Sequence, residues 1–164
     1  MIRVTHDSSA LVLEAIQAMA RQRVLIGIPQ PKDIRRPDGK YKAKIGNAGL
    51  GFVHEFGSPH ANIPARPFLV PGVREAGPAC AAILKESAGV ALLRGEGIEK
   101  GLEKAGLRAV SYVKRRITGQ VGFQPLKAGT IAARERDNKK GTKALIRTGQ
   151  LLNSITYVVR SHGG

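Results

Sequence analysis

The chain has 164 residues, which is enough for one domain with an ordinary hydrophobic core. Hydrophobic residues make up 42% of the chain, but aromatic residues make up only 4% and tryptophan is absent, so the core must be aliphatic and rich in alanine. The single cysteine, Cys80, excludes disulfides and cysteine-rich metal sites by count, and its apolar surroundings predict a buried structural thiol.

The sequence gives no sign of a membrane or of export. It contains no run of about 18 apolar residues, so we expect no membrane span. Its first residues lack the apolar segment of a signal peptide. We therefore expect a protein that stays in the cytoplasm after synthesis.

The net charge of +15 comes almost entirely from two segments. Residues 21–44 carry eight Lys or Arg against two acids, and residues 114–147 carry ten against two. Both segments are rich in glycine, proline or polar residues over much of their length. We therefore expect the charge to lie mainly on loops.

The N-terminal third predicts a helix, a strand and a long loop. Apolar residues recur on one face from Leu11 to Arg23 after the N-cap candidates Asp7-Ser8-Ser9, as in a helix. Residues 24–28 (VLIGI) are apolar on both sides and predict an interior strand. Residues 30–46 predict a protruding basic hairpin with a turn at Asp38-Gly39; its candidate assembly residues are Arg35, Arg36, Lys40 and Lys42.

The centre of the chain predicts a second strand followed by a rigid elbow. Residues 47–56 are interpreted as the strand, and residues 57–67 contain three prolines, which cannot continue a helix and restrict the residue before each of them. The elbow should set the angle between the strand and the next helix, and Phe68 should anchor in the core. Its candidate structural and interface residues are Phe56, Gly57, Pro64, Arg66, Pro67 and Phe68.

Two helices are predicted after the elbow. The helical period runs from about Pro71 to Leu92, and Pro78 suggests a late start or a kink. A second apolar stripe runs from Ile98 to Ile117 with spacings of three and four residues. Gly95 and Gly97 break the pattern between them, so we expect an antiparallel helical hairpin.

The C-terminal third predicts a mobile basic segment and a last strand. Residues 120–144 have little apolar content and allow a short helical turn at Thr130–Arg136. The candidate assembly residues in this segment are Arg134, Arg136, Lys139, Lys140 and Lys143. Residues 145–160 predict a capped helical turn and then a strand in which Ile155, Tyr157 and Val159 alternate, and this strand should pair antiparallel with an earlier one.

Together these elements predict one α+β domain over residues 1–164. Its sheet, antiparallel or mixed, should have three to four strands. An N-terminal helix and the long helical hairpin should pack on that sheet, and extended basic loops should project from it.

The sequence offers weak support for catalysis. His54-Glu55 suggests a zinc-dependent hydrolase, but the next histidine is His60, and the intervening Gly57-Ser58-Pro59 forbids the helix on which such a site depends. Residues 46–51 (GNAGLG) resemble a dinucleotide-binding loop only superficially, and we interpret them as close backbone packing. We expect no enzyme, no cofactor and no metal site.

The basic loops have two interpretations. Clustered Lys and Arg can neutralise DNA phosphates, or basic arms can order against acidic faces of partner proteins. Aromatic residues for base stacking are nearly absent, with Tyr41 alone in the first loop and Phe123 in the second. We therefore favour protein docking over direct DNA contact and expect no sequence-specific readout.

Two long motifs carry a family resemblance. The elbow HEFGSP…IPARPFL at 54–69 and the segment LIRTGQLLNSITY at 145–157 together resemble the neck and tail-completion proteins of long-tailed double-stranded DNA bacteriophages, also described as virion morphogenesis or minor tail-component proteins. Residues 125–134 resemble the family's connecting segment. In Mu-like phages the Thr-Gly-x-Leu element precedes the Pro-Ala-Arg-Pro-Phe element, whereas here the order is reversed.

The resemblance implies a structural protein of the virion, made in the host cytoplasm and located at the neck, where the head joins the tail. It would form a ring of roughly six or twelve copies. Its partners would be other neck, connector, tail-terminator or tail-tube proteins, with DNA passing through the lumen. The alternative is a basic DNA-binding accessory protein. Within the elbow, we expect Arg66 to bond with backbone carbonyls or a neighbouring carboxylate.

Overall fold

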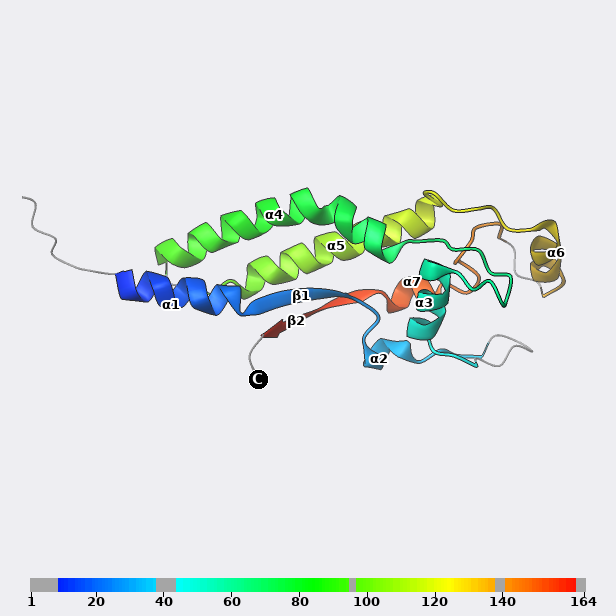
Figure 1. Ribbon diagram of the computed structural model, residues 1–164, viewed down its shortest axis with the longest axis horizontal. Helices are drawn as coiled ribbons and strands as arrows, with labels where there is room; N and C mark the ends of the chain where they lie inside the picture. Colours follow the sequence, from blue (N-terminus) through cyan, green and yellow to red (C-terminus); the bar gives the residue numbers. More distant parts are fainter. Residues whose placement is uncertain (1–8, 38–43, 95–96, 138–140, 162–164) are drawn as a thin grey trace, which may run out of the picture.

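The computed structural model describes residues 9–37, 44–94, 97–137 and 141–161. Figure 1 shows an elongated molecule with α1 near one end and α6 at the other. The elements in chain order are α1 (Ser9–Ala20), β1 (Gln22–Gly27), α2 (Gln30–Asp33), α3 (Asn47–Phe56), α4 (Leu69–Arg94), α5 (Glu99–Gly119), α6 (Ala128–Arg136), α7 (Gln150–Ser154) and β2 (Thr156–Ser161). The fold is therefore α+β and mostly helical.

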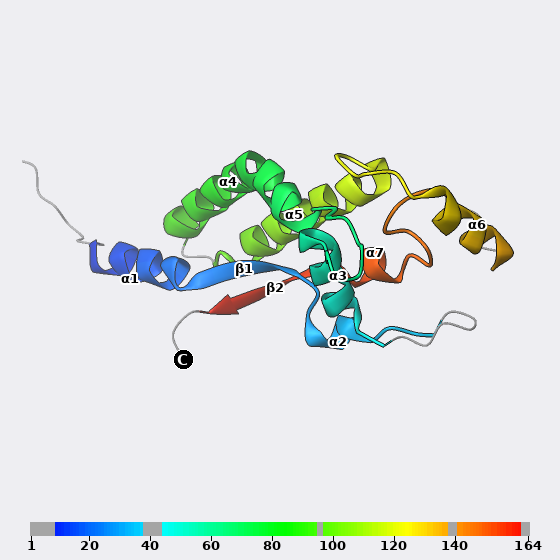
Figure 2. The same cartoon turned by 45° about the vertical axis from the view of Figure 1, so that its right-hand side comes forward.

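The helical hairpin predicted after the elbow is confirmed. Helices α4 and α5 lie side by side and antiparallel in both views (Figures 1 and 2). Helix α4 runs through Pro78 without a break in its assignment. The helices approach closely where Gly72 of α4 faces Val113 of α5, because a Cβ at position 72 would lie 2.8 Å from the Val113 Cα.

The sheet is smaller than predicted. The described residues form two strands, β1 and β2, which pair antiparallel in the register Val24 with Val159 and Ile26 with Tyr157. One face of this ribbon packs on α5, where a Cβ at Gly106 would lie 2.5 Å from the Tyr157 ring. The antiparallel pairing of the last strand is confirmed, but three to four strands are not found among the described residues.

The prediction of a strand over residues 47–56 is wrong, because this segment is helix α3. Its buried residues are Asn47, Gly51 and Glu55, which recur every fourth residue on one face of the helix. The start of α3 is held by the Asp33 carboxylate, which accepts a 2.6 Å hydrogen bond from the Ala48 N–H. The elbow therefore joins two helices, not a strand and a helix.

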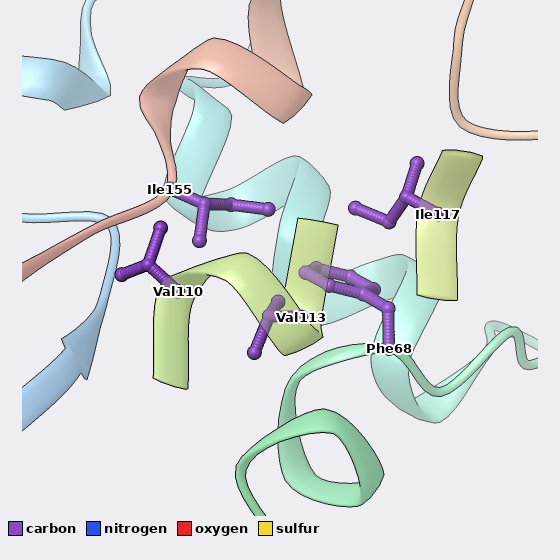
Figure 3. Close-up of a cluster of buried hydrophobic side chains, with 5 residues drawn as sticks. All are labelled: Phe68, Val110, Val113, Ile117 and Ile155. Carbon is purple, nitrogen blue, oxygen red and sulfur yellow. The ribbon is translucent and has the colours of Figure 1, made fainter. Parts of the chain in front are cut away.

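The core lies where the elbow, α5 and the segment before β2 meet. Figure 3 shows Phe68 at the start of α4 pointing toward side chains of α5 and toward Ile155. These side chains are almost completely buried; they are Phe68, Val110, Val113, Ile117 and Ile155. The expectation that Phe68 anchors the elbow in an aliphatic core is confirmed.

The remaining predicted elements agree with the structure to within a few residues, but the prediction of an interior strand at residues 24–28 is wrong, because β1 pairs only with β2 among the described residues. The N-terminal helix, the strand after it, the helical turn before Arg136 and the turn before the last strand correspond to α1, β1, α6 and α7. Helix α2 was not predicted. The turn expected at Asp38-Gly39 lies outside the described residues.

Helix α4 has two properties that differ from the sequence expectations. By length and composition alone it could cross a membrane, which is weak evidence because core helices share both properties. Its Cys80 is only half-buried, although the Sγ–H donates to the Ala105 carbonyl at 3.4 Å. Burial raises the pKa of the Cys80 thiol.

Candidate functional site

The elbow begins with a glycine that no other residue could replace without strain. Gly57 ends α3 with a φ of 78°, and a Cβ there would lie 2.9 Å from the Ala65 nitrogen. Ser58 and Ile63 then pair through two hydrogen bonds of 2.9 and 3.0 Å between their backbones. The chain between Gly57 and Ala65 is thus a compact loop whose ends lie close together.

The carboxylate of Glu55 ties the two helices of the elbow together. It is 7% exposed and accepts hydrogen bonds from the backbone N–H groups of Phe68 (2.7 Å), Leu69 (2.8 Å) and Val70 (2.9 Å). These N–H groups belong to the start of α4, where no partner exists within the helix. A negative charge at a helix N-terminus is also favoured by the helix dipole. Glu55 therefore fixes the start of α4 against the last turn of α3.

Arg66 fastens the elbow to the segment that follows α5. Arg66 is 6% exposed, and its guanidinium donates to the Gln124 carbonyl at 3.1 Å and the Pro125 carbonyl at 3.5 Å. Its backbone N–H donates to the His54 carbonyl at 2.7 Å. Of the two partners expected for Arg66, backbone carbonyls are the ones observed.

A pocket of about 330 Å³ opens beside the elbow. Its cationic side chains come from segments far apart in the sequence; they are Arg35, Arg66, Lys127, Arg134 and Arg147. No carboxylate lines this pocket among the described residues. Its apolar surface comes from α3, the elbow, the α5–α6 connection, the 141–149 segment and α7; it includes Leu50, Ile63, Leu126, Leu145 and Leu151. We call this site the basic pocket.

Two titratable groups of the basic pocket have lowered pKa values, mainly through burial and secondly through neighbouring positive charges. Burial, followed by the charges of Arg66 and Arg35, lowers the pKa of His54 from 6.5 to about 4. Burial, followed by the charges of Arg147 and Arg66, also lowers the pKa of Arg134. His54 is therefore neutral at pH 7, and its Nδ1 is buried with no hydrogen-bond partner among the described residues.

The walls of the basic pocket are held by side chains bonded to loop backbones. Arg134 is 8% exposed and donates to the Gly141 carbonyl at 3.0 Å and the Lys143 carbonyl at 2.9 Å. Gln120 both accepts from the Ala144 N–H and donates to its carbonyl. The described part of the segment expected to be mobile, residues 120–144, is thus anchored at several points.

The predicted site residues separate into four groups. Pro64, Arg66, Arg35 and Arg134 line the basic pocket, and Phe68 lies in the core. Others lie elsewhere in the described part of the chain; these are Phe56, which is exposed with its ring 4.8 Å from that of Phe52, together with Gly57, Pro67, Arg36, Arg136 and Lys143. Lys40, Lys42, Lys139 and Lys140 lie outside the described residues.

The charge was expected mainly on loops, but a substantial part of it lies on helices. Lys114, Arg115 and Arg116 belong to α5, and Arg134 and Arg136 belong to α6. Arg116 forms an ion pair with Glu75 of α4. Lys143, which was expected to contact other subunits, donates its Nζ–H to the Thr118 carbonyl at 2.8 Å within the chain.

Sequence reasoning missed the roles of Glu55, His54 and Arg147. The sequence does contain a signal for Glu55. This acid lies fourteen residues before the first residue of α4, and the loop between them must turn back on itself, which brings the carboxylate to the start of α4. Arg147 lies near the start of the segment predicted at residues 145–160, pairs with Asp137 at 2.8 Å and lines the pocket. Nothing in its local sequence indicates either contact.

The structure also bears on the two weak catalytic motifs. The Glu55 carboxylate is occupied by three amide donors, so its geometry does not support zinc binding or general-base chemistry. No group of three His, Cys, Asp or Glu side chains gathers as a metal site in the described part of the chain. Residues 46–51 open helix α3 and not the predicted strand, but the Asp33 carboxylate already accepts a hydrogen bond from an N–H there. A Cβ added at Gly51 would lie 3.2–3.6 Å from the side chains of Ile28, Leu151 and Phe68, which agrees with close packing at this glycine.

Comparisons with family models, curated proteins and solved structures found no match to the chain. The function must therefore be argued from the residues, the pocket and the exposed surfaces of this molecule.

Proposed function

We propose that the protein is a non-enzymatic structural subunit of a bacteriophage neck, located in the virion at the head–tail junction. It would form a ring that joins or completes the tail, with partners among the other neck, connector, tail-terminator and tail-tube proteins. The two sequence motifs that resemble this family, at 54–69 and 145–157, support the proposal. Its physical support is the amount of apolar surface that a single chain leaves uncovered.

Part of the exposed apolar surface lies on α1 and on the last turns of α4. Val12, Leu13 and Ile16 of α1 are 41%, 56% and 46% exposed, and Leu93 of α4 is 88% exposed. Helices α1 and α4 contact one another, so these side chains belong to neighbouring elements. A helix that is apolar on several sides is normally covered. A neighbouring subunit in a ring would cover this surface.

In such a subunit the elbow would keep the body rigid. Glu55 and Arg66 hold α3, α4 and the α5–α6 connection in one arrangement, so the body of the subunit keeps its shape while basic side chains contact neighbours. The two-stranded ribbon also leaves one edge of each strand unpaired among the described residues. In a ring, strands from adjacent copies could extend it to the three or four strands expected from the sequence.

The first test is the assembly state of the purified chain, measured by mass photometry and negative-stain electron microscopy. We expect ring-shaped particles. Leu13→Glu should abolish them because it places a charge on the exposed apolar face of α1. Gln17→Glu adds the same charge at an exposed polar position of α1 and should leave the particles intact. Particles unaffected by Leu13→Glu would contradict the proposed interface.

The second test is made in the phage. Arg66→Ala removes the bonds with the Gln124 and Pro125 carbonyls and should lower the yield of joined virions. Heads and unjoined tails should accumulate in electron micrographs. Normal virion yield from a folded Arg66→Ala protein would overturn the role given to the elbow.

A basic DNA-binding accessory protein is the alternative, favoured by the net charge of +15. It predicts a steep salt dependence of duplex binding, because each neutralised phosphate releases counterions. A gel-shift titration across salt concentrations would measure the slope. The neck proposal expects only weak, sequence-independent binding that gives no defined complex.

A further inference from the structure

We infer that the basic pocket binds an acidic, partly apolar peptide segment of a different protein. A carboxylate of that segment would lie against Arg35 and Lys127, with a neighbouring apolar side chain on Leu50 and Leu151. This inference does not rest on the ring, because it concerns the pocket of a single subunit.

The pocket is positively charged. Five cationic side chains line it and no carboxylate does, among the described residues. Arg66 and Arg134 are already bonded with backbone carbonyls, which satisfy donors but carry no compensating charge. Arg35 has no hydrogen-bond acceptor in the described part of the chain. Arg147 is paired with Asp137, but no ion pair with a carboxylate is observed for the other four cations in the described part of the chain, so an anion bound there would be stabilised.

The pocket is also small and partly apolar. A volume of about 330 Å³ lies at the lower end of ligand pockets, which span about 300–1,000 Å³. It can hold a few side chains of an extended segment but not a folded element. Leucine, isoleucine and proline side chains contribute to its lining. A free phosphate would leave this apolar surface uncovered, whereas an acidic peptide with leucine or valine neighbours would cover it.

The burial of Arg66 and Arg134 disfavours a duplex as the natural occupant of the pocket. DNA phosphates are read by exposed cations arranged along a backbone. Arg66 and Arg134 are only 6% and 8% exposed and lie within a concave site. A rigid duplex cannot enter the pocket to reach them, but one flexible side chain of a peptide can.

The charge of this chain points to a different protein, and not a second copy, as the source of the peptide. This chain has 12 acidic residues against 27 basic ones, so a second copy brings mainly repulsion. Five of its acids are already bonded inside the molecule: Asp33, Glu55, Glu75, Glu99 and Asp137. The segment therefore belongs to an acidic partner protein.

The probe for this inference is a fluorescein-labelled capped peptide of sequence Gly-Asp-Leu-Glu-Leu-Asp-Gly, measured by fluorescence anisotropy at about 0.1 M salt. Its amide counterpart, Gly-Asn-Leu-Gln-Leu-Asn-Gly, keeps the shape without the charge. We expect the acidic peptide to bind at least about tenfold more tightly than the amide peptide. Inorganic phosphate and a short DNA duplex are added as competitors.

The decisive variant is the double substitution Arg35→Gln with Lys127→Gln. Neither side chain holds the fold, since Lys127 makes only a 3.5 Å contact with Asn62. The double substitution should weaken binding of the acidic peptide about tenfold or more. Arg108→Gln removes an exposed charge on α5, outside the pocket, and should change binding less than about twofold.

Three outcomes would overturn the inference. The first is equal loss of binding in the double variant and in Arg108→Gln, which would show a general charge effect. The second is no peptide binding up to about 1 mM. The third is duplex binding, or phosphate displacement of the peptide, that depends on Arg35 and Lys127 while the acidic and amide peptides bind alike. The assembly tests of the ring are separate measurements, so failure of one proposal leaves the other standing.

Discussion

At the scale of single residues, the Glu55 carboxylate connects the two helices on either side of the elbow. One carboxylate satisfies three N–H groups at the start of α4 and does so from the last turn of α3. Hydrogen bonds that involve a charged group are stronger than neutral ones, and the helix dipole adds to them. The Glu55 carboxylate therefore acts with the backbone contacts of the elbow, such as the Arg66 N–H to the His54 carbonyl, to fix the angle between the two helices.

The Glu55→Gln variant tests this dependence. The amide retains an oxygen acceptor but loses the charge and buries an NH₂ group among N–H donors. We expect the free energy of unfolding to fall by about 2 kcal/mol, measured by urea denaturation. Glu103→Gln, at an exposed position of α5, is the control and should change it little. Equal stability of Glu55→Gln and wild type would show that the charge does not hold the elbow.

His54 should give the protein a pH-dependent stability. Its pKa is about 4 in the folded chain and 6.5 as a model value, so the unfolded chain binds a proton first as the pH falls. Stability is therefore full above about pH 6.5 and decreases toward pH 4. The loss from this group at about pH 5 is at most about 2 kcal/mol.

The comparison of wild type with His54→Gln isolates this effect. Urea midpoints at about pH 7 and about pH 5 give the pH dependence of each protein. Carboxylates titrate in both, so the difference between the two slopes belongs to His54. We expect a smaller loss of stability in the variant. Parallel pH profiles would mean that the His54 ring titrates as it does in water.

At the scale of elements, the sequence predicts helices well and fails where a helix lacks the usual pattern. The apolar stripe of α5 fixes its limits to within two residues. In contrast, α3 presents Asn47, Gly51 and Glu55 to the interior, none of which counts as an apolar residue. Its exposed face carries Phe52 and Phe56, so the usual placement of apolar residues on the buried face of a helix is inverted. Together with two glycines, this pattern predicts a strand and not a helix.

The candidate site shows the same limit for a different reason. The elbow could be predicted, because prolines and glycine act on the local backbone. The basic pocket could not, because Arg35, Arg66, Arg134 and Arg147 come from four separated segments and meet only in the folded chain. Their convergence depends on loop contacts such as the one that Arg134 makes with the Gly141 and Lys143 carbonyls.

The contact between α4 and α5 provides a test at this scale. Gly72→Ala would place a Cβ 2.8 Å from the Val113 backbone, so we expect a loss of about 1–3 kcal/mol in the free energy of unfolding. Gly89→Ala, on the same helix, meets no atom within 4 Å and should gain up to about 1 kcal/mol from helix propensity. Urea denaturation measures both. A loss of unfolding free energy in both variants, or a gain in both, would contradict the close approach at Gly72.

At the scale of the whole molecule, two surface properties oppose each other. The apolar side chains of α1 and the end of α4 favour association of copies, because association removes them from water. The net charge of +15 disfavours it, because each copy repels the next. The balance between these effects depends on ionic strength, since charges separated by more than about 10 Å are screened at about 0.1 M salt.

Salt should therefore act in opposite directions on the two proposals. Raising the salt concentration from about 0.05 to about 0.5 M should shift the purified chain toward larger particles in sedimentation velocity, because repulsion is screened while apolar contacts persist. The same series should weaken binding of the acidic peptide to the basic pocket, since that attraction is screened as well. Leu13→Glu should stay small at every salt concentration. Particles that dissociate as salt rises would instead assign the contact between copies to charged residues, and would place the interface away from α1.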